Sequence, residues 1–243
     1  MELKSLIFLL ALAAGSARAL VLPRDPQPSS SQQSYPNSTD ISVFNGQWYF
    51  VGFSKEYQNV MENPIKDMNI TLNCCTLNMS NRTQTVLALD ISCSVQNLTS
   101  TSSIGNVTSQ GVALLSPPSS DIDVSKNQFT FQVYLDVWKF NQQDSQNATI
   151  LPGASHQMQG SLNAEYLPAN GSIQEAVFFS SCDEDTSSSH RKRCHSENVD
   201  CSAALVYRQP TLDSTTFRNI TSGIQLGDNA AENLFQVNNT CSA

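Results

Sequence analysis

Apolar and polar residues alternate with a period of two along most of the chain between residues 46 and 208. In residues 85–95 the apolar side chains of Leu87, Leu89 and Ile91 fall on one face, and Asp90 falls on the other. A strand that is buried on one face has this pattern, because successive side chains point to opposite sides of a sheet. Further segments of this kind are 46–53, 68–74, 111–116, 129–137, 156–166, 172–182 and 201–208. We therefore predict about eight antiparallel strands.

Closing such strands into a barrel removes their unpaired edges. A barrel of about eight strands is just wide enough to be filled by side chains or to hold one small ligand. The predicted fold class is therefore all-β, an eight-stranded up-and-down antiparallel barrel.

One helix is expected after the last barrel strand. Asp213 can cap it, Leu212 and Phe217 have the spacing of a hydrophobic staple, and Gly223 can end it. A short strand at residues 233–237 and Cys241 follow.

The first 40 residues have the composition of a targeting segment followed by a linker. Residues 1–19 carry an early Lys4, an apolar run of about nine residues and a small-residue ending, which is typical of a secretory signal peptide. Spanning a membrane takes about twenty apolar residues, so we expect no transmembrane segment. Residues 20–40 are rich in Pro, Ser and Gln and are predicted to be a flexible linker. Residues 41–243 are then one barrel domain, secreted and extracellular.

Charge and glycosylation sequons agree with secretion. The formal net charge is −8, and it becomes −9 without residues 1–19, which argues against nucleic acid as a partner. An exported chain would expose many of its N-x-S/T sequons to glycosylation. The candidate glycosylation sites are Asn37, Asn69, Asn78, Asn81, Asn97, Asn106, Asn147, Asn170, Asn219 and Asn238.

The cysteines allow a partial disulfide prediction. The chain has 7 cysteines, which an oxidising compartment permits. Cys182 and Cys201 end two neighbouring strands and could close the loop that carries Cys194. Because the number is odd, one thiol is free or forms an intermolecular disulfide.

No metal, cofactor or catalytic group is predicted. His156 falls on the apolar face of its strand, where a partly buried, hydrogen-bonded histidine is favoured over a haem ligand. His190 and His195, near Cys194 and Cys201, do not have zinc-ligand spacing. The sequence contains no nucleophile elbow, P-loop or dinucleotide-binding motif. We therefore predict that the protein is not an enzyme.

Two segments resemble signatures of the lipocalin family. Gly46-x-Trp48-Tyr49 opens the first strand, and residues 205–212, LVYRQPTL, precede the helix and the terminal cysteine. The middle lipocalin signature is only weakly matched, by residues 164–166. The resemblance covers about residues 43–241. It implies that Trp48 closes the base of the barrel and that Arg208 packs across it. It also implies that Cys241 ties the C-terminal tail to the barrel wall, with Cys93, Cys74 or Cys75 as partner.

The resemblance and the apolar inner faces predict a glycosylated carrier of a small hydrophobic ligand of the lipid, retinoid, sterol or pigment type. The expected barrel lining is Leu87, Leu89, Ile91, Phe129, Phe131, Val133 and Leu135. Two alternatives are an enzyme on the same barrel and an extracellular interaction protein whose barrel is filled.

Residues 187–197 contain the basic pair Lys192-Arg193. This segment is either a solvated loop tip or a dibasic processing site.

Overall fold

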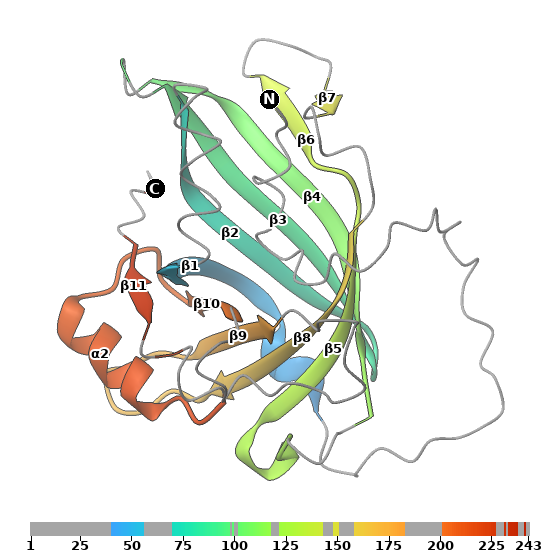
Figure 1. The fold of residues 1–243 in the computed structure, drawn as a ribbon, viewed down its shortest axis with the longest axis vertical. Coiled ribbons are helices and arrows are strands. Elements are labelled where there is room, and N and C mark those ends of the chain that lie inside the picture. The colour runs from blue at the N-terminus through green and yellow to red at the C-terminus, as the bar shows by residue number, and fades with distance from the viewer. Residues whose placement is uncertain are drawn as a thin grey trace, which may run out of the picture.

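The structure is a computed structural model that describes residues 40–55, 70–97, 99, 102–117, 122–142, 148–150, 158–182, 201–226, 231, 233–237 and 241 (Figure 1). The strands are β1 (Gly46–Ser54), β2 (Ile70–Thr83), β3 (Val86–Asn97), β4 (Ser103–Leu115), β5 (Gln128–Leu135), β6 (Lys139–Gln142), β7 (Ala148–Ile150), β8 (Met158–Leu167), β9 (Ala176–Cys182), β10 (Cys201–Tyr207) and β11 (Leu234–Gln236). The helices are α2 (Ser214–Gly223) and the 3₁₀ turns η2 (Ile41–Phe44) and η3 (Val124–Lys126).

Eight of these strands form a closed antiparallel ring in the order β1, β10, β9, β8, β5, β4, β3 and β2, with β2 pairing again to β1. The predicted up-and-down barrel is therefore confirmed. β6 and β7 were not predicted. They form a hairpin that adds to the first half of β4, because β4 pairs with β5 through 111–115 and with β6 through 105–108.

The predicted alternation holds best in β3. Its odd-numbered residues from Leu87 to Val95 are all buried, and Asp90 is exposed. In β8, Leu162 and Ala164 are buried as expected. Side chains of this inner face pack into one cluster inside the barrel.

A second cluster explains why β9 and β10 have apolar residues on both faces. Helix α2 and β11 cover the outside of β1, β9 and β10, where Leu205 and Phe217 are buried. Gly52 of β1 allows this approach, since a Cβ atom there would lie 2.8 Å from the Phe217 ring.

The helix starts and ends where the sequence predicts. The Asp213 side chain accepts hydrogen bonds from the backbone N–H groups of Thr215 and Thr216 at 3.0 and 2.9 Å, and the last helical residue is Gly223. Leu212 and Phe217 pack in the same cluster, in agreement with the predicted staple.

In β2 the expected alternation holds at Leu72, which packs on the inner cluster, and is wrong from Cys74 onward. Cys74, which alternation puts on the same face as Leu72, has φ of 46° at a break in the β2–β3 register. The buried residues beyond it are Cys75, Leu77 and Met79. A bulge of one residue moves every following side chain to the opposite face.

This bulge directs two adjacent cysteines to different partners. Cys74 forms a disulfide with Cys241, and Cys75 forms one with Cys93 inside the barrel. Of the three partners left open for Cys241, the structure therefore has Cys74. Cys182 and Cys201 lie directly opposite each other in the β9–β10 ladder, and the disulfide between them stays a prediction.

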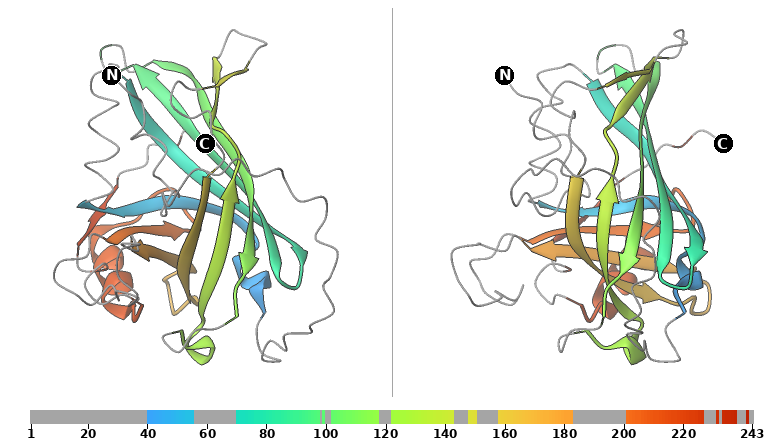
Figure 2. Two further views of the ribbon diagram at one scale, coloured as in Figure 1. Left: turned by 45° about the vertical axis from the view of Figure 1, so that its right-hand side comes forward. Right: turned by 90° about the vertical axis from the view of Figure 1, so that its right-hand side faces the viewer.

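The two ends of the barrel differ. β2, β3 and β4 rise beyond the ends of β1, β9 and β10 on one side, as Figures 1 and 2 show. On that side the second half of β1 pairs with β11 instead of β2, whose pairing to β1 covers only Met79 to Thr76. We call this the open end. The opposite, closed end carries η2 and the tight turn between β2 and β3.

Candidate ligand-binding site

The closed end of the barrel is sealed by Trp48. Its side chain is fully buried, and its indole Nε1–H donates to the Phe44 carbonyl oxygen at 2.7 Å. The Arg208 guanidinium lies over the ring, with Cζ 3.5 Å from the ring centroid, which is within cation–π range. This is the contact that the lipocalin resemblance implies. Gly46 has φ of 108°, and a Cβ atom there would meet Arg208 Nη1 at 2.7 Å. Gly46 of the first motif therefore leaves the space that the Arg208 guanidinium of the last motif occupies.

Two acceptors hold Arg208 in place, the Glu175 carboxylate and the Gln47 carbonyl oxygen, which lies 3.5 Å from Arg208 Nη1. Arg208 Nε donates to Glu175 Oε2 at 2.7 Å. Burial by itself would raise the pKa of the Glu175 carboxyl, but hydrogen bonds from Arg208 and Tyr166 and the Arg208 charge lower it. Burial, together with the hydrogen bond to the Glu175 carboxylate and its charge, raises the pKa of Tyr166 to about 12. These groups have a structural role at the base.

The lower barrel, next to this base, is almost filled. Its interior holds a cavity of about 20 Å³, which is room for about one water molecule. Leu87, Leu89, Phe131 and Val133 of the expected lining border this cavity. The rest of its lining is Phe44, Leu77, Met79, Ala113, Leu162 and Phe179.

The other three expected lining residues do not border the cavity. Phe129 packs against the Phe44 ring at 5.2 Å between centroids, close to the base. Ile91 and Leu135 are buried in the inner cluster. All seven residues therefore face inward, and their role in binding a ligand stays a prediction.

The inner surface at the open end is apolar and partly exposed. Four side chains pack on the inner cluster without being fully buried, and we call them the apolar rim: Phe53, Leu72, Ile104 and Phe140. They come from the end of β1, the start of β2, the start of β4 and from β6, all of which lie at the open end. Phe53 stacks on Phe50, which is fully buried below it.

Between the rim and the lower cavity lies Trp138, a residue that the sequence analysis missed. The expected strand 129–137 ends at Leu135, and β6 starts at Lys139. The break turns the next large side chain inward, so Trp138 is 3% exposed and belongs to the inner cluster. Val137, expected on the inner face, is only half-buried and is not part of that cluster.

The break before Trp138 is held by β4. Ser109 Oγ donates to the Asp136 carbonyl oxygen at 2.9 Å, and the Asp136 N–H donates to the Gln110 carbonyl oxygen at 2.7 Å. The Asp136 side chain accepts from the Val137 N–H at 2.9 Å and pairs with Lys139 at 3.9 Å. The loop that carries Trp138 is therefore held to β4 by hydrogen bonds at Asp136.

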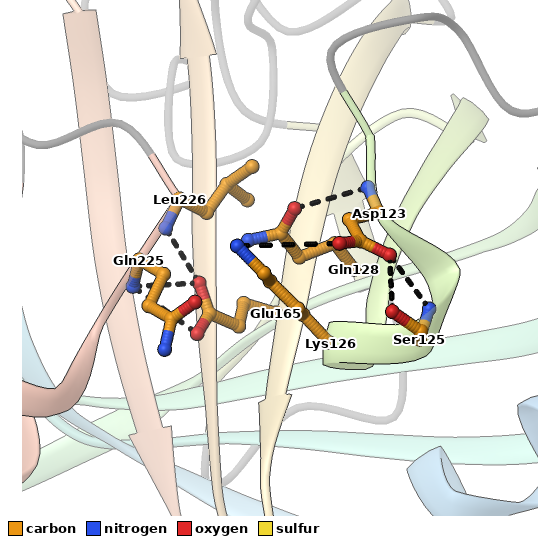
Figure 3. A network of polar contacts seen from close by, with 7 residues as sticks. All are labelled: Asp123, Ser125, Lys126, Gln128, Glu165, Gln225 and Leu226. Carbon is orange, nitrogen blue, oxygen red and sulfur yellow. Dashed lines mark hydrogen bonds and ion pairs between the residues drawn. The ribbon is translucent and has the colours of Figure 1, made fainter.

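A buried carboxylate lies on the outer side of the barrel. Glu165 of β8 is 3% exposed and accepts from the backbone N–H groups of Gln225 at 3.0 Å and Leu226 at 2.6 Å, just after α2 (Figure 3). Burial raises the pKa of Glu165, although these hydrogen bonds lower it. Both oxygens are bound to backbone, so Glu165 fastens the segment after the helix to the barrel.

The remaining predicted groups are distributed over the surface or fall outside the described residues. Asn97 is half-buried, whereas the exposed sequon residues are Asn78, Asn81, Asn106, Asn170 and Asn219. The candidate sites outside the described residues are Asn37, Asn69, Asn147, Asn238, His156, His190, Cys194, His195 and Lys192-Arg193, together with the signal peptide and the linker up to residue 39.

Within the described part of the chain, no group of His, Cys, Asp and Glu side chains is arranged to bind a metal. No helix among these residues has the length and apolar character needed to cross a membrane.

Comparison with known proteins finds likeness only among solved structures. No protein-family model matches the chain, and no curated protein sequence does. The region aligned with an apocrustacyanin covers 82% of this chain and 78% of the apocrustacyanin chain, with 8% sequence identity and a TM-score of 0.39. The region aligned with a biogenic amine-binding protein covers 83% of this chain and 80% of that protein's chain, with 11% sequence identity and a TM-score of 0.38. The region aligned with a siderocalin covers 83% of this chain and 94% of the siderocalin chain, with 12% sequence identity and a TM-score of 0.34.

These three proteins are lipocalins. At such low identities and scores, nothing about ligand or activity is carried over from them. The assignment of the fold depends on the chain itself: the eight-stranded ring, the helix that follows β10, and the Arg208–Trp48 contact at the base. The chain therefore has a lipocalin-like fold, a closed up-and-down barrel with one C-terminal helix.

Proposed function

We propose that the protein is a secreted, glycosylated carrier that binds a small hydrophobic molecule at the open end of its barrel. The observation that carries this proposal is the apolar rim, in which Phe53, Leu72, Ile104 and Phe140 stay partly exposed above a continuous apolar interior. A water-exposed apolar surface inside a barrel mouth is a typical place for a small ligand.

The small size of the lower cavity supports a ligand site nearer the open end. A cavity of about 20 Å³ in the lower barrel is too small for a lipid, retinoid, sterol or pigment. The ligand therefore lies in the upper half, between the rim and Trp138. Burying about 200 Å² of its apolar surface would contribute about 5 kcal/mol before the costs of binding.

The exposed sequons and the disulfides support the secreted, glycosylated part of the proposal. Asn78, Asn106 and Asn219 lie on the outer surfaces of β2, β4 and α2, away from the barrel mouth lining. The Cys74–Cys241 and Cys75–Cys93 bonds require an oxidising compartment to form and persist. Treatment of protein from a eukaryotic secretory host with an N-glycosidase should lower its apparent mass.

The binding test compares two neighbouring residues on opposite faces of β4. Ile104 belongs to the rim, and Ser103 next to it is exposed. We expect Ile104→Asp to weaken binding of the neutral fluorescent probe N-phenyl-1-naphthylamine by at least about tenfold, because it places a charge on the apolar contact surface. Ser103→Asp adds the same charge nearby and should bind as the unmodified protein does.

Two results would contradict the proposal. The first is that the unmodified, folded protein binds no apolar probe. The second is that both variants bind the probe equally well. The almost filled lower barrel makes an extracellular interaction protein the second candidate, and the first of these results would favour it.

A further inference from the structure

The two tryptophans of the chain differ in how their indole N–H groups are satisfied. Trp48 Nε1 donates to the Phe44 carbonyl oxygen, whereas Trp138 Nε1 is buried and has no hydrogen-bond partner among the residues that the structure describes. A buried donor without an acceptor is destabilising, because it has lost its hydrogen bond to water and gained none in return. Native proteins rarely keep such a group unless it has a use.

The position of Trp138 in the barrel is defined by the strand registers. Leu135 pairs with Gly111 and Phe140 pairs with Val107, so Trp138 lies at the level of Ser109 between them. This level is one layer below the rim residue Phe140 and one above the layer of Leu135. Two residues along a strand span about 7 Å. A ligand that enters between the rim residues and extends about one further layer into the barrel therefore reaches the level of Trp138.

β4 holds the backbone of the loop at Asp136, which determines where the Trp138 side chain leaves the chain. The Ser109 hydroxyl donates to the Asp136 carbonyl oxygen, and its oxygen does not accept from Trp138 Nε1 in this structure. The inner cluster around Trp138 consists of apolar side chains among the residues that the structure describes. Among the described residues, the N–H group therefore lies in a largely apolar surrounding, with Ser109 as a buried polar side chain at its level.

We propose that Trp138 Nε1 donates a hydrogen bond to the ligand, and that the ligand is an uncharged apolar molecule with an acceptor oxygen, such as a ketone, aldehyde or ester. This inference depends on the proposed binding function. A carboxylate is disfavoured because the buried polar residues that the structure describes include no Lys, Arg or His to compensate its charge. Arg208 lies at the base, beyond Trp48, and is already paired with Glu175.

The test uses two probes that differ by one carbonyl group, 2-acetylnaphthalene and 2-ethylnaphthalene, each measured by displacement of N-phenyl-1-naphthylamine. Trp138→Phe keeps an aromatic ring and removes the donor. We expect this variant to bind the ketone about fivefold more weakly, as for loss of one neutral hydrogen bond. Binding of the ethyl compound should change less than twofold, because it has no acceptor.

A second measurement uses the unmodified protein and does not depend on how the variant folds. With two tryptophans, a ¹⁵N-labelled sample has two indole N–H signals, and Trp48 is the internal control. We expect 2-acetylnaphthalene to move the Trp138 N–H proton downfield and to leave the Trp48 signal in place. The ethyl compound should produce a much smaller shift.

The outcomes separate the two proposals. If neither naphthalene nor the fluorescent probe binds, the binding function itself is overturned. If all three bind, but Trp138→Phe affects both naphthalenes alike and both move the Trp138 signal equally, the carrier proposal stands and the assigned hydrogen bond is wrong. In that case an ordered water satisfies the indole.

Discussion

The contact between Arg208 and Trp48 is testable by a double-mutant cycle. Trp48→Leu removes the π face and the indole N–H, and it leaves the Phe44 carbonyl oxygen without its donor. Because the side chain is fully buried, the expected loss of unfolding free energy is about 3–5 kcal/mol. Arg208→Met keeps the aliphatic stem and loses the hydrogen bond to Glu175, with an expected loss of about 1–2 kcal/mol.

The informative quantity is the coupling between these two changes. A guanidinium carbon 3.5 Å from the ring centroid predicts a favourable coupling of about 0.5–2 kcal/mol for a partly desolvated cation–π pair. Urea unfolding followed by far-UV circular dichroism gives each free energy without depending on tryptophan fluorescence. The slope of free energy against urea should be the same for all four proteins.

An arginine elsewhere provides the control. Arg218 is exposed on α2, so Arg218→Met combined with Trp48→Leu should be additive within about 0.5 kcal/mol. If the Arg208 cycle is also additive within that error, the stacking contributes nothing, and Arg208 is held at the base by its hydrogen bonds to Glu175 and to the Gln47 carbonyl oxygen.

Three further predictions concern stability. The pKa of Glu165 is raised, so its contribution to the unfolding free energy is fully present below the ordinary pKa of 4.5 and is lost as pH rises through the raised pKa. The urea midpoint of the unmodified protein should therefore fall over this pH range, and that of Glu165→Gln should lack this decline. Glu175 has a lowered pKa, so its contribution is present above the ordinary value and lost as pH falls through the lowered pKa; Glu175→Gln should remove that acid-side loss from a titration of urea midpoints. Replacing Cys74 and Cys241 together by serine should cost about 2–5 kcal/mol in unfolding free energy, and a midpoint equal to that of the unmodified protein would show that the bond constrains nothing.

The barrel could be predicted because its strands alternate as half-buried strands must. Leu87 to Val95 in β3 follow the pattern without interruption, and the Asp213 cap and the Gly223 end of α2 depend only on local backbone hydrogen bonds. The base could be predicted from motifs at both ends of the domain. The structure adds the reason for Gly46, since the Arg208 side chain occupies the space of its missing Cβ atom.

The hairpin of β6 and β7 and the filled lower barrel could not be predicted in the same way. Whether side chains meet across a barrel depends on strand register and on the twist of the wall, and alternation specifies neither. Leu89 and Phe131 both point inward by pattern, but only the folded barrel shows that they leave about 20 Å³ between them and their neighbours.

The two errors in the predicted inner faces have one physical cause. In each, a carboxylate or amide inside an alternating run bonds the next backbone N–H: the Asn73 side chain accepts from Cys74, and the Asp136 side chain accepts from Val137, both at 2.9 Å. Such local bonds compete with the strand ladder, and the register changes just after them.

The residues that these breaks place inside the barrel are those most relevant to its chemistry. The first break turns Cys75 toward Cys93, and the second turns Trp138 into the barrel interior, where its N–H has no partner within the described part of the chain. A polar residue in an alternating run is not by itself a signal, because Asp90 interrupts nothing and simply points to solvent. What distinguishes the breaks is the hydrogen bond to the following N–H. The candidate ligand contact therefore became visible only when the backbone at Asp136 was known.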